Sequence, residues 1–200
     1  VDILVNCAGV DAFAHLHDLD PQEIQRVVQT NLTAALQLAR LAIPLMAARG
    51  WGHIVNMASM AGKHSPPYAS VYAATKAGLI AMTQSLRNEY RSRNISATAI
   101  CPGFTTGAGI YERMQSDVGR DAPFWLGGTS VEAVARATVR AIRKDQPEVI
   151  VNTPPHRLAL AIAALFPRVG EWLIRKASGR YFRDLARARR TTQPASVRLE

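Results

Sequence analysis

The sequence predicts an α/β fold, in which helices cover a doubly wound parallel sheet and a helical extension follows at the C-terminal end. Short apolar segments typical of buried strands alternate with longer segments that have the periodicity of amphipathic helices. The connections between them are short, and this alternation favours a parallel sheet. The segments with strand character lie within residues 1–9, 52–59, 95–100 and 148–152.

The first long helix has a clear start and a clear end in the sequence. Residues 20–23, Asp-Pro-Gln-Glu, combine an acidic N-cap, a proline in the first turn and a glutamate that can reach back to the cap. We expect the helix to run to Ala48, because Gly50 suits the left-handed position that ends many helices. Pro44 lies in the last turns and is expected to kink them.

The segments between the later strands are less regular. A loop rich in glycine, serine and proline, residues 61–70, leads into a helix that we expect to extend to about Ser92. Residues 104–128 have the character of an irregular loop with a short helix around the sequence YERMQ. Thr129 and Glu132 match a second capping box, which would open the helix that follows.

Composition and charge narrow the class of protein. A chain of 200 residues, 48% of them hydrophobic, fits one globular domain and argues against disorder. No run reaches the roughly 18 apolar residues that a membrane span requires, and the five histidines form no metal-ligand pattern. The net charge of +9 is uneven, because residues 168–190 hold eight basic and two acidic residues. The positive charge therefore belongs mainly to the tail.

Tyr72 and Lys76 form the most informative pair in the sequence. Positions i and i+4 share one face of a helix, with Cβ atoms roughly 5–6 Å apart. A lysine ammonium so placed lowers the pKa of a phenol, whose ordinary value is about 10. The tyrosine thereby becomes a usable general acid and base near neutral pH. Ser59 lies 13 residues before Tyr72, where a strand-to-helix connection could place its hydroxyl beside the phenol.

With these residues, five ordered segments resemble the short-chain dehydrogenase/reductase family. Their order and spacing match the family pattern over residues 1 to about 107. The resemblance implies a Rossmann-type sheet and an NAD(P)-dependent oxidoreductase that moves a hydride between nicotinamide and a carbonyl or secondary alcohol. The matching segments are residues 5–9 (VNCAG), 30–32 (TNL), 52–59 (GHIVNMAS), 72–76 (YAATK) and 101–103 (CPG).

The resemblance also implies that part of the family fold is missing from this sequence. In the family the opening strand is the fourth of the sheet, and the Gly-rich turn that holds the dinucleotide pyrophosphate follows the first strand. Because the sequence contains no such turn, we expect the C-terminal portion of a longer enzyme, without roughly its first third; a natural short protein is the alternative. Residues 1–153 would form the catalytic part and residues 154–200 an amphipathic basic extension.

Four residues acquire catalytic roles from the resemblance. Tyr72 would donate a proton to a substrate carbonyl, or accept one from an alcohol. Lys76 would lower the pKa of Tyr72 and hydrogen-bond the nicotinamide ribose, and Ser59 would donate a hydrogen bond to the substrate oxygen. Asn31 would hold a water that relays protons to Lys76. The structural alternatives are an ordinary strand-end serine at position 59 and a helix-bend hydrogen bond at position 31.

Other residues of the matching segments would contact the cofactor, which is NAD or NADP. Cys7 stands where the family usually has a second asparagine, so the role of its segment is partly structural. Gly107 stands where a threonine often occurs, and Thr105 or Thr106 would contact the carboxamide instead. The residues that the resemblance places at the cofactor are Asn6, Ala8, Gly9, Tyr72, Lys76, Pro102, Gly103 and Thr105.

The substrate would be a small alcohol or ketone, and the apolar residues 124–126 and 158–166 hint at an apolar one. Three other functions remain open. The chain alone could be a non-catalytic fragment, or its tail could make it a lipid-surface binding protein. Sugar-nucleotide epimerases and dehydratases share the YxxxK motif, although no large substrate domain follows the motif here.

Partners and location follow from the same features. Family members commonly pair through the two long helices, so we expect a homodimer or homotetramer. Cys7 and Cys101 would lie on strands separated by a third strand, beyond disulfide reach, and reduced thiols favour a cytoplasmic location. The amphipathic tail would cover the substrate pocket or an interface, or lie at a membrane surface. No nucleic-acid partner is expected, because aromatic residues are not interleaved with the arginines.

Overall fold

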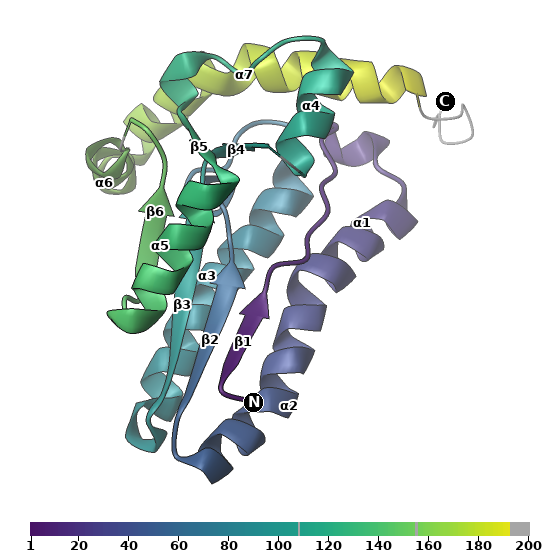
Figure 1. The fold of residues 1–200 in the computed structure, drawn as a ribbon. Helices are drawn as coiled ribbons and strands as arrows, with labels where there is room; N and C mark the ends of the chain where they lie inside the picture. Colours follow the sequence, from purple (N-terminus) through teal and green to yellow (C-terminus); the bar gives the residue numbers. More distant parts are fainter. Residues whose placement is uncertain (108, 155, 193–200) are drawn as a thin grey trace.

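A four-stranded parallel sheet forms the centre of the molecule (Figure 1). The computed structural model describes residues 1–107, 109–154 and 156–192. The strand order is β1–β2–β3–β6, and neighbouring strands run parallel. The predicted α/β fold with a doubly wound, Rossmann-type sheet is therefore confirmed. The strands are β1 (Ile3–Asn6), β2 (Gly52–Met57), β3 (Ile95–Pro102) and β6 (Glu148–Val151).

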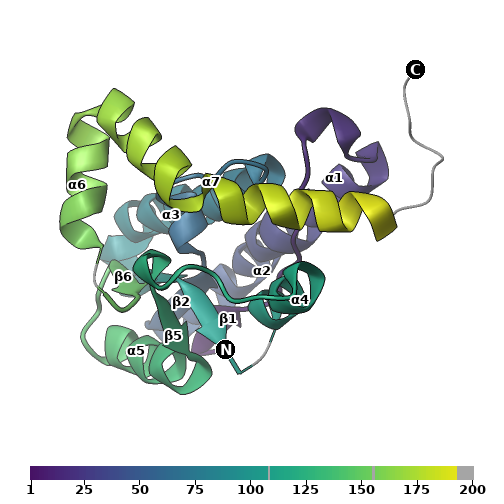
Figure 2. The same cartoon turned by 90° about the horizontal axis from the view of Figure 1, so that it is seen from above.

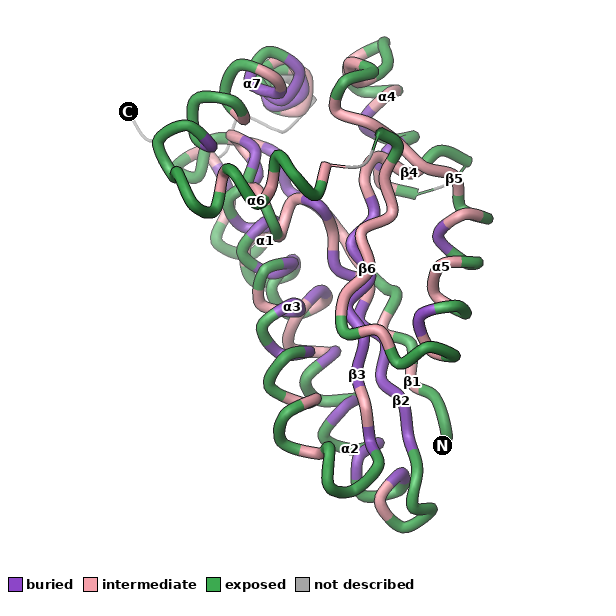
Figure 3. The backbone as a smooth tube through the Cα atoms, turned by 90° about the vertical axis from the view of Figure 1, so that its left-hand side faces the viewer, coloured by how far each residue is buried: buried purple, intermediate pink, exposed green. Residues whose placement is uncertain are grey.

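Helices connect the strands and cover both faces of the sheet. They are α1 (Pro21–Val28), α2 (Ala34–Arg49), α3 (Ser70–Tyr90), α4 (Ile110–Val118), α5 (Val131–Arg143), α6 (Arg157–Leu165) and α7 (Pro167–Thr192). α2 and α3 pack on one face of the sheet, and α5 packs on the other (Figure 3). α7 lies across the end of the sheet at which the strands terminate (Figure 1).

Side chains alternate between two cores along β2 and β3, as the pleat of a strand requires. Ile54 and Ala97 belong to the core formed with α2 and α3. Val55 and Ile100 instead pack with Val134 of α5. Both strands are buried over nearly their whole length (Figure 3), and their buried polar side chains His53, Asn56 and Thr98 are hydrogen-bonded.

The first long helix begins and ends close to the expected residues. Oδ1 of Asp20 accepts a 2.7 Å hydrogen bond from the backbone N–H of Gln22. Gly50, with φ 74°, adopts the left-handed conformation that ends α2. A five-residue π-helical segment, Gln29–Thr33, separates α1 from α2, and Pro44 lies inside α2.

One stretch of the described chain, Pro21–Arg49, has the length and apolar content of a membrane span. This apolar content comes partly from a face that packs on the sheet, including Ala35, Ala39 and Met46. A core helix of a globular protein can have the same length and apolar content, so these two properties are weak support for a membrane span. The other contribution comes from exposed leucines on α2, namely Leu36, Leu38, Leu41 and Leu45.

The segment 104–128 is more regular than the sequence predicts. It contains the expected helix, α4, but also β4 (Phe104–Thr106), which pairs in parallel with β5 (Gly128–Ser130). Strands of three residues are too short to show a periodic pattern, which explains the error. The cap of α5 is also displaced by one residue, because Ser130 Oγ, not Thr129, accepts a 3.2 Å hydrogen bond from Ala133.

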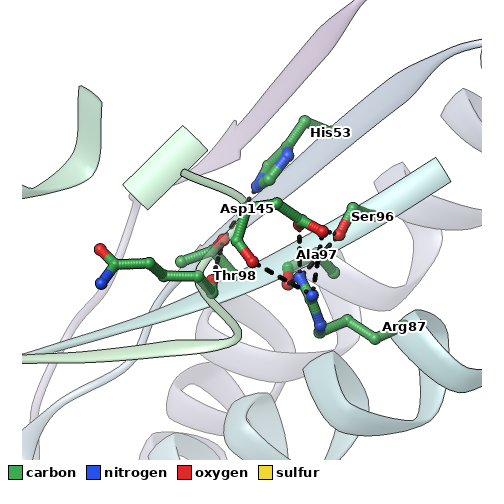
Figure 4. Close-up of polar contacts among 7 residues, drawn as sticks. His53, Arg87, Ser96, Ala97, Thr98 and Asp145 are labelled. Atoms are coloured by element: carbon green, nitrogen blue, oxygen red, sulfur yellow. Dashed lines mark hydrogen bonds and ion pairs between the residues drawn. The ribbon is translucent and has the colours of Figure 1, made fainter. Parts of the chain in front are cut away.

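A polar network joins α3 to the turn after α5 across β3 (Figure 4). The Arg87 guanidinium donates hydrogen bonds to Asp145 at 2.7 Å, to the Ala97 carbonyl at 2.8 Å and to Ser96 at 2.6 Å. The Ser96 hydroxyl also contacts Asp145. A single guanidinium thus fixes a helix, a strand and a turn. Arg87 also holds the pKa of the Asp145 carboxyl below its ordinary value.

His53 and Thr98 extend the network towards the inside of the sheet. The Thr98 hydroxyl donates a 2.7 Å hydrogen bond to the carbonyl of Gln146, so it can only accept from His53, whose Nε2 lies 2.8 Å away. The proton of the imidazole is therefore on Nε2. Burial lowers the pKa of His53, although the charge of Asp145 opposes this shift.

The C-terminal helix packs onto the rest of the molecule. α7 runs across the end of the sheet, from α6 towards α1 and α4 (Figure 2). Its Phe182 and Leu185 are buried in a cluster that includes Phe13 and Tyr72. Arg189 forms ion pairs with Asp11 at 3.1 Å and Asp117 at 2.8 Å. The tail, expected as an extension, therefore contributes to the wall around Tyr72.

Candidate active site

Ser59 lies where β2 leads into a short 3₁₀ helix, Met60–Gly62, and its Oγ accepts a 3.1 Å hydrogen bond from the backbone of the helix that it caps. Gly62 lets this helix approach α3 closely, because a Cβ at position 62 would lie 2.7 Å from the carbonyl carbon of Lys76. The serine hydroxyl thereby comes within hydrogen-bonding reach of Tyr72. The pair that the sequence separates by 13 residues is thus brought together.

Tyr72 and Lys76 lie one turn apart at the start of α3, and both side chains are buried. Lys76 Nζ lies 5.7 Å from the centroid of the Tyr72 ring. It donates a 2.7 Å hydrogen bond to the carbonyl oxygen of Met57 at the end of β2. On the other side, the Phe13 ring packs against Tyr72 with centroids 5.6 Å apart. The pair is held between a strand end and an aromatic cluster.

Burial changes the proton affinity of both groups. It raises the pKa of the Tyr72 phenol from 10.0 to about 12, while the hydrogen bond with Ser59 opposes the shift. It lowers the pKa of the Lys76 ammonium from 10.5 to about 8, with smaller opposing contributions from two thiols. The prediction that Lys76 leaves Tyr72 with a lowered pKa is therefore wrong for this structure. Desolvation of the phenolate outweighs the attraction of a lysine whose own charge is disfavoured by burial.

Asn31 lies in the π-helical segment and is only 1% exposed. Its Oδ1 accepts a 2.8 Å hydrogen bond from the backbone N–H of Val10. Its Nδ2 donates to the Val10 carbonyl at 2.8 Å and to the Thr75 hydroxyl at 3.1 Å. These bonds tie the loop after β1 to α3. The second lone pair of Asn31 Oδ1 can still accept a hydrogen bond from a water. The proton relay from this water to Lys76 stays a prediction.

A cavity of about 660 Å³ opens beside these residues, and Ser59, Tyr72 and Lys76 are part of its lining. Within the described residues, Nζ of Lys76 has one hydrogen-bond acceptor, the Met57 carbonyl. An ammonium has three N–H donors, so two can bind oxygen atoms of a ligand. Of the other residues expected at a cofactor, Gly9, Pro102, Gly103 and Thr105 line the cavity, whereas Asn6 and Ala8 do not. Asn31, expected as a catalytic residue, does not line the cavity either.

Two of the remaining assignments become more specific. Asn6 Nδ2 donates a 2.8 Å hydrogen bond to Oδ1 of Asn56 on the neighbouring strand, so it steadies the sheet beside the cavity. The hydroxyl of Thr106 donates to the Thr129 carbonyl at 3.1 Å and lies outside the cavity lining. Thr105, by contrast, lines the cavity. The structure therefore favours Thr105 over Thr106 as the threonine that could meet a ligand.

The apolar wall of the cavity was not found from the sequence motifs. It includes Phe13, Tyr111, Met114, Leu126 and Phe182, which come from the loop after β1, from α4, from a 3₁₀ helix and from α7. The amphipathic pattern of the tail did predict that it could cover a pocket, and Phe182 does so. Leu126 belongs to the apolar residues 124–126 that hinted at an apolar substrate. Phe13, Tyr111 and Met114 carry no such signal, because they meet the other lining residues only in the folded chain.

The cavity wall also carries two histidines, His64 and His156. Burial lowers the pKa of His64, and the nearby His156 lowers it further. Nδ1 of His156 lies 2.9 Å from Nδ2 of Asn152, so it accepts this hydrogen bond and the imidazole proton is on Nε2. In the described parts of the chain, no group of three or more histidine, cysteine, aspartate or glutamate side chains is placed to hold a metal.

Comparison with known proteins defines the class of protein. The short chain dehydrogenase family model matches residues 1–118. Ketoacyl reductase HetN from Nostoc sp. is 38% identical over 181 residues, which cover 86% of this chain and 62% of the relative. D-beta-hydroxybutyrate dehydrogenase from Cupriavidus necator is 32% identical over 161 residues, which cover 80% of this chain and 59% of the relative.

Solved structures agree with this assignment. A short chain dehydrogenase/reductase family protein superimposes with a TM-score of 0.67 at 30% identity, covering 76% of this chain and 65% of the other. A 4-hydroxyisoleucine dehydrogenase complexed with NADH has the same fold, with a TM-score of 0.63 at 22% identity; the match covers 75% of this chain and 66% of the other. The chain belongs to the short-chain dehydrogenase/reductase family. It spans about three-fifths of the length of the curated relatives described above.

Proposed function

We propose that the protein is an NAD(P)-dependent oxidoreductase that interconverts a carbonyl group and a secondary alcohol. The observation that carries this proposal is that Ser59, Tyr72 and Lys76 all line one cavity. The names of its relatives support the reaction class, since they include a ketoacyl reductase and a hydroxybutyrate dehydrogenase.

The proton chemistry follows from the three side chains. A phenol with a pKa of about 12 is protonated at neutral pH, so Tyr72 is ready to donate its proton to a carbonyl oxygen during reduction. The Ser59 hydroxyl donates a hydrogen bond to the same oxygen, where negative charge develops. In the oxidative direction Tyr72 must accept a proton, and the positive charge of Lys76 favours the phenolate that this step requires.

The residues beside the cavity fit a nicotinamide nucleoside. The two unused N–H donors of Lys76 suit ribose hydroxyls, and the Pro102–Gly103 turn lines the neighbouring wall. Bound nicotinamide supplies or accepts the hydride. Gly9 leaves room beside Lys76, because a Cβ at position 9 would lie 3.3 Å from Nζ. The apolar wall formed by Phe13, Met114 and Phe182 favours an apolar substrate.

We also propose that the enzyme acts in the cytoplasm as a homodimer or homotetramer. Leu36, Leu41 and Leu45 on α2 support such pairing, since between 48% and 57% of each residue is exposed. The C-terminal helices add a second apolar surface, which suits contact with a membrane. Sedimentation equilibrium of the purified chain, with Leu41→Glu as the interface variant, tests the pairing.

The direct test of the function is turnover of NADH and NADPH with ketones of increasing apolar size, followed at 340 nm. Because the sequence lacks a Gly-rich pyrophosphate turn, we expect residues 1–200 alone to show little turnover. The assay is therefore also made on the protein encoded together with any in-frame sequence upstream of Val1. Turnover that survives Tyr72→Phe would contradict the assignment. Turnover of sugar nucleotides but not of simple ketones would favour an epimerase or dehydratase.

A further inference from the structure

The corner formed by α6 and α7 carries an unusual concentration of exposed apolar side chains. On α6, Leu158, Ile162 and Leu165 follow one helical face, with exposures of 75%, 38% and 75%. Phe166, at the bend between the helices, is 60% exposed. Val169, Trp172 and Leu173 continue along α7 with exposures of 45%, 51% and 38%. We call these seven residues the elbow surface.

The two helices of the elbow are packed closely against each other. Gly170 on α7 is buried, and a Cβ at this position would lie 2.7 Å from the Cβ of Ala163 on α6. The elbow is therefore a defined corner, visible at the end of the molecule in Figure 2. Its apolar side chains are held outward while small residues fill the contact between the helices.

A second apolar group lies next to the elbow surface. Phe124 and Trp125, in the 3₁₀ helix Phe124–Leu126, are 84% and 51% exposed. Nε1 of Trp125 donates a 3.1 Å hydrogen bond to the carbonyl of Ala177 on α7. This bond attaches the two aromatic side chains to the tail. A contiguous exposed apolar region of this kind is typical of an interaction site and uncommon on a soluble monomer.

The charges around the elbow surface indicate what covers it. Between residues 156 and 180, the basic side chains are exposed on the same two helices, and Glu171 is the single acidic residue of that stretch. Glu171 lies 3.9 Å from Arg175, so part of its charge is compensated. Apolar and tryptophan side chains flanked by arginine and lysine suit the interface of an anionic bilayer. The basic residues are Arg157, Arg168, Arg175, Lys176 and Arg180.

We propose that the elbow surface docks on an anionic lipid bilayer. The apolar side chains enter the interfacial region, and the surrounding cations contact the lipid head groups. The surface borders the candidate active site, because His156, which directly precedes α6, and Ser178 of α7 both line the cavity. An apolar substrate dissolved in the bilayer would thus meet the cavity at its edge, a consequence that rests on the proposed function, whereas the docking itself does not.

The proposal is tested by sedimentation of the 200-residue chain with vesicles. Vesicles of phosphatidylcholine are compared with vesicles containing about 30% phosphatidylglycerol, at low and at physiological ionic strength. We expect binding to the anionic vesicles that weakens with salt, because head-group attraction is screened. The double variant Leu165→Ser and Phe166→Ser should weaken binding by about tenfold or more. No binding of the unmodified chain to anionic vesicles at low salt would overturn the proposal.

A matched control comes from the opposite side of the molecule. Leu16 and Val28 are 56% and 37% exposed and lie outside the leucines proposed for pairing, so Leu16→Ser with Val28→Ser should leave vesicle binding unchanged. Circular dichroism spectra and thermal midpoints establish that both double variants remain folded. An equal loss of binding in this control variant would overturn the proposal. So would a change of oligomeric state in the elbow variant without any vesicle binding, since a second copy of the chain would then be the partner.

Tryptophan quenching gives an independent readout within a folded protein. Trp172 lies on the elbow surface, whereas Trp51 directly precedes β2, which begins at the far end of the sheet (Figure 1). In chains that retain only Trp172 or only Trp51, brominated phosphatidylcholine should quench Trp172 and leave Trp51 unaffected. Equal quenching of the two would contradict docking at the elbow. Vesicle binding of the 200-residue chain, together with no turnover of any nicotinamide cofactor by the protein encoded with the in-frame sequence upstream of Val1, would leave the docking standing and remove the proposed function.

Discussion

The ammonium of Lys76 is bound to the carbonyl oxygen of Met57, 2.7 Å away, at the point where β2 ends. The strand thus holds the lysine charge at a set position beside Tyr72, with two N–H donors left over. Burial of this charge costs stability, and the lowered pKa of about 8 reflects that cost. The site therefore holds a charge that the fold alone would not favour.

Removal of this charge should stabilise the fold. We expect Lys76→Met to raise the free energy of unfolding at pH 7 by about 2 kcal/mol, since the side chain is only 3% exposed. The folded pKa of Lys76 is lowered from 10.5 to about 8, so between these pH values the unfolded chain binds more protons and the original protein gains stability as pH rises. The advantage of the variant should shrink over this window. Urea denaturation at several pH values measures it, with the exposed Lys144→Met as control.

Tyr72→Phe tests the proton transfer. We expect turnover in the proposed reaction to fall by about 100-fold or more, because phenylalanine has no hydroxyl proton to transfer. The phenylalanine ring keeps the packing against Phe13. Binding of the nicotinamide cofactor, measured by fluorescence titration, should change little. The comparison variant is Tyr68→Phe, in which a partly buried tyrosine of the preceding loop loses its hydroxyl. Retention of most turnover in Tyr72→Phe would contradict the assigned role.

The two thiols should differ strongly in reactivity. Cys7 is exposed, whereas Cys101 is fully buried and burial raises its pKa to about 12. We expect a thiol reagent to modify Cys7 rapidly in the native protein and to modify Cys101 only after unfolding in urea. Cys7→Ser should abolish the rapid phase. Rapid modification of Cys101 in the folded state would contradict the position of β3 inside the sheet.

The Arg87 network should contribute to stability more than an exposed ion pair does. Replacement of Arg87 by Met removes the guanidinium donor from the Ala97 carbonyl and from the Asp145 carboxylate, which keeps the hydrogen bond from the Ser96 hydroxyl (Figure 4). We expect the free energy of unfolding to fall by about 2 kcal/mol. Arg26→Met, which removes an exposed pair with Glu23, should cost less than about 0.5 kcal/mol. Equal losses in the free energy of unfolding for the two substitutions would show that the Arg87 network stabilises the fold no more than an exposed ion pair does.

The packing of the tail can be tested with two leucines. Leu185 on α7 is fully buried, whereas Leu165 on α6 is 75% exposed. Leu185→Ala should lower the free energy of unfolding by about 3 kcal/mol, and Leu165→Ala should change it by less than about 0.5 kcal/mol. A negligible effect at position 185 would mean that α7 does not cover the cluster around Tyr72.

Local sequence patterns were sufficient for much of the fold. The apolar segments and helical periodicities predicted the parallel sheet, and Asp20 and Gly50 predicted the ends of the first long helix. The spacing of Tyr72 and Lys76 predicted a shared helical face. Each of these features depends on residues within a few positions of one another, so the chain itself contains the necessary signal.

Tertiary structure decided the features that depend on distant residues. The pairing of β4 with β5 joins segments more than 20 residues apart, and neither segment is long enough to show a pattern alone. The amide of Asn31 binds Val10 and Thr75, which no local motif indicates. Phe13 and Phe182 meet beside Tyr72 although nearly the whole chain separates them.

The pKa of Tyr72 shows most clearly the difference between what local sequence predicts and what tertiary structure decides. The sequence by itself determined that a lysine lies one helical turn from the tyrosine, and this proximity predicts a lowered pKa. Only the folded chain decided how completely the phenol is removed from water, and the resulting pKa is raised to about 12. Spacing along a helix is a local property, whereas desolvation depends on every segment packed around a side chain, here the loop after β1, α4 and α7.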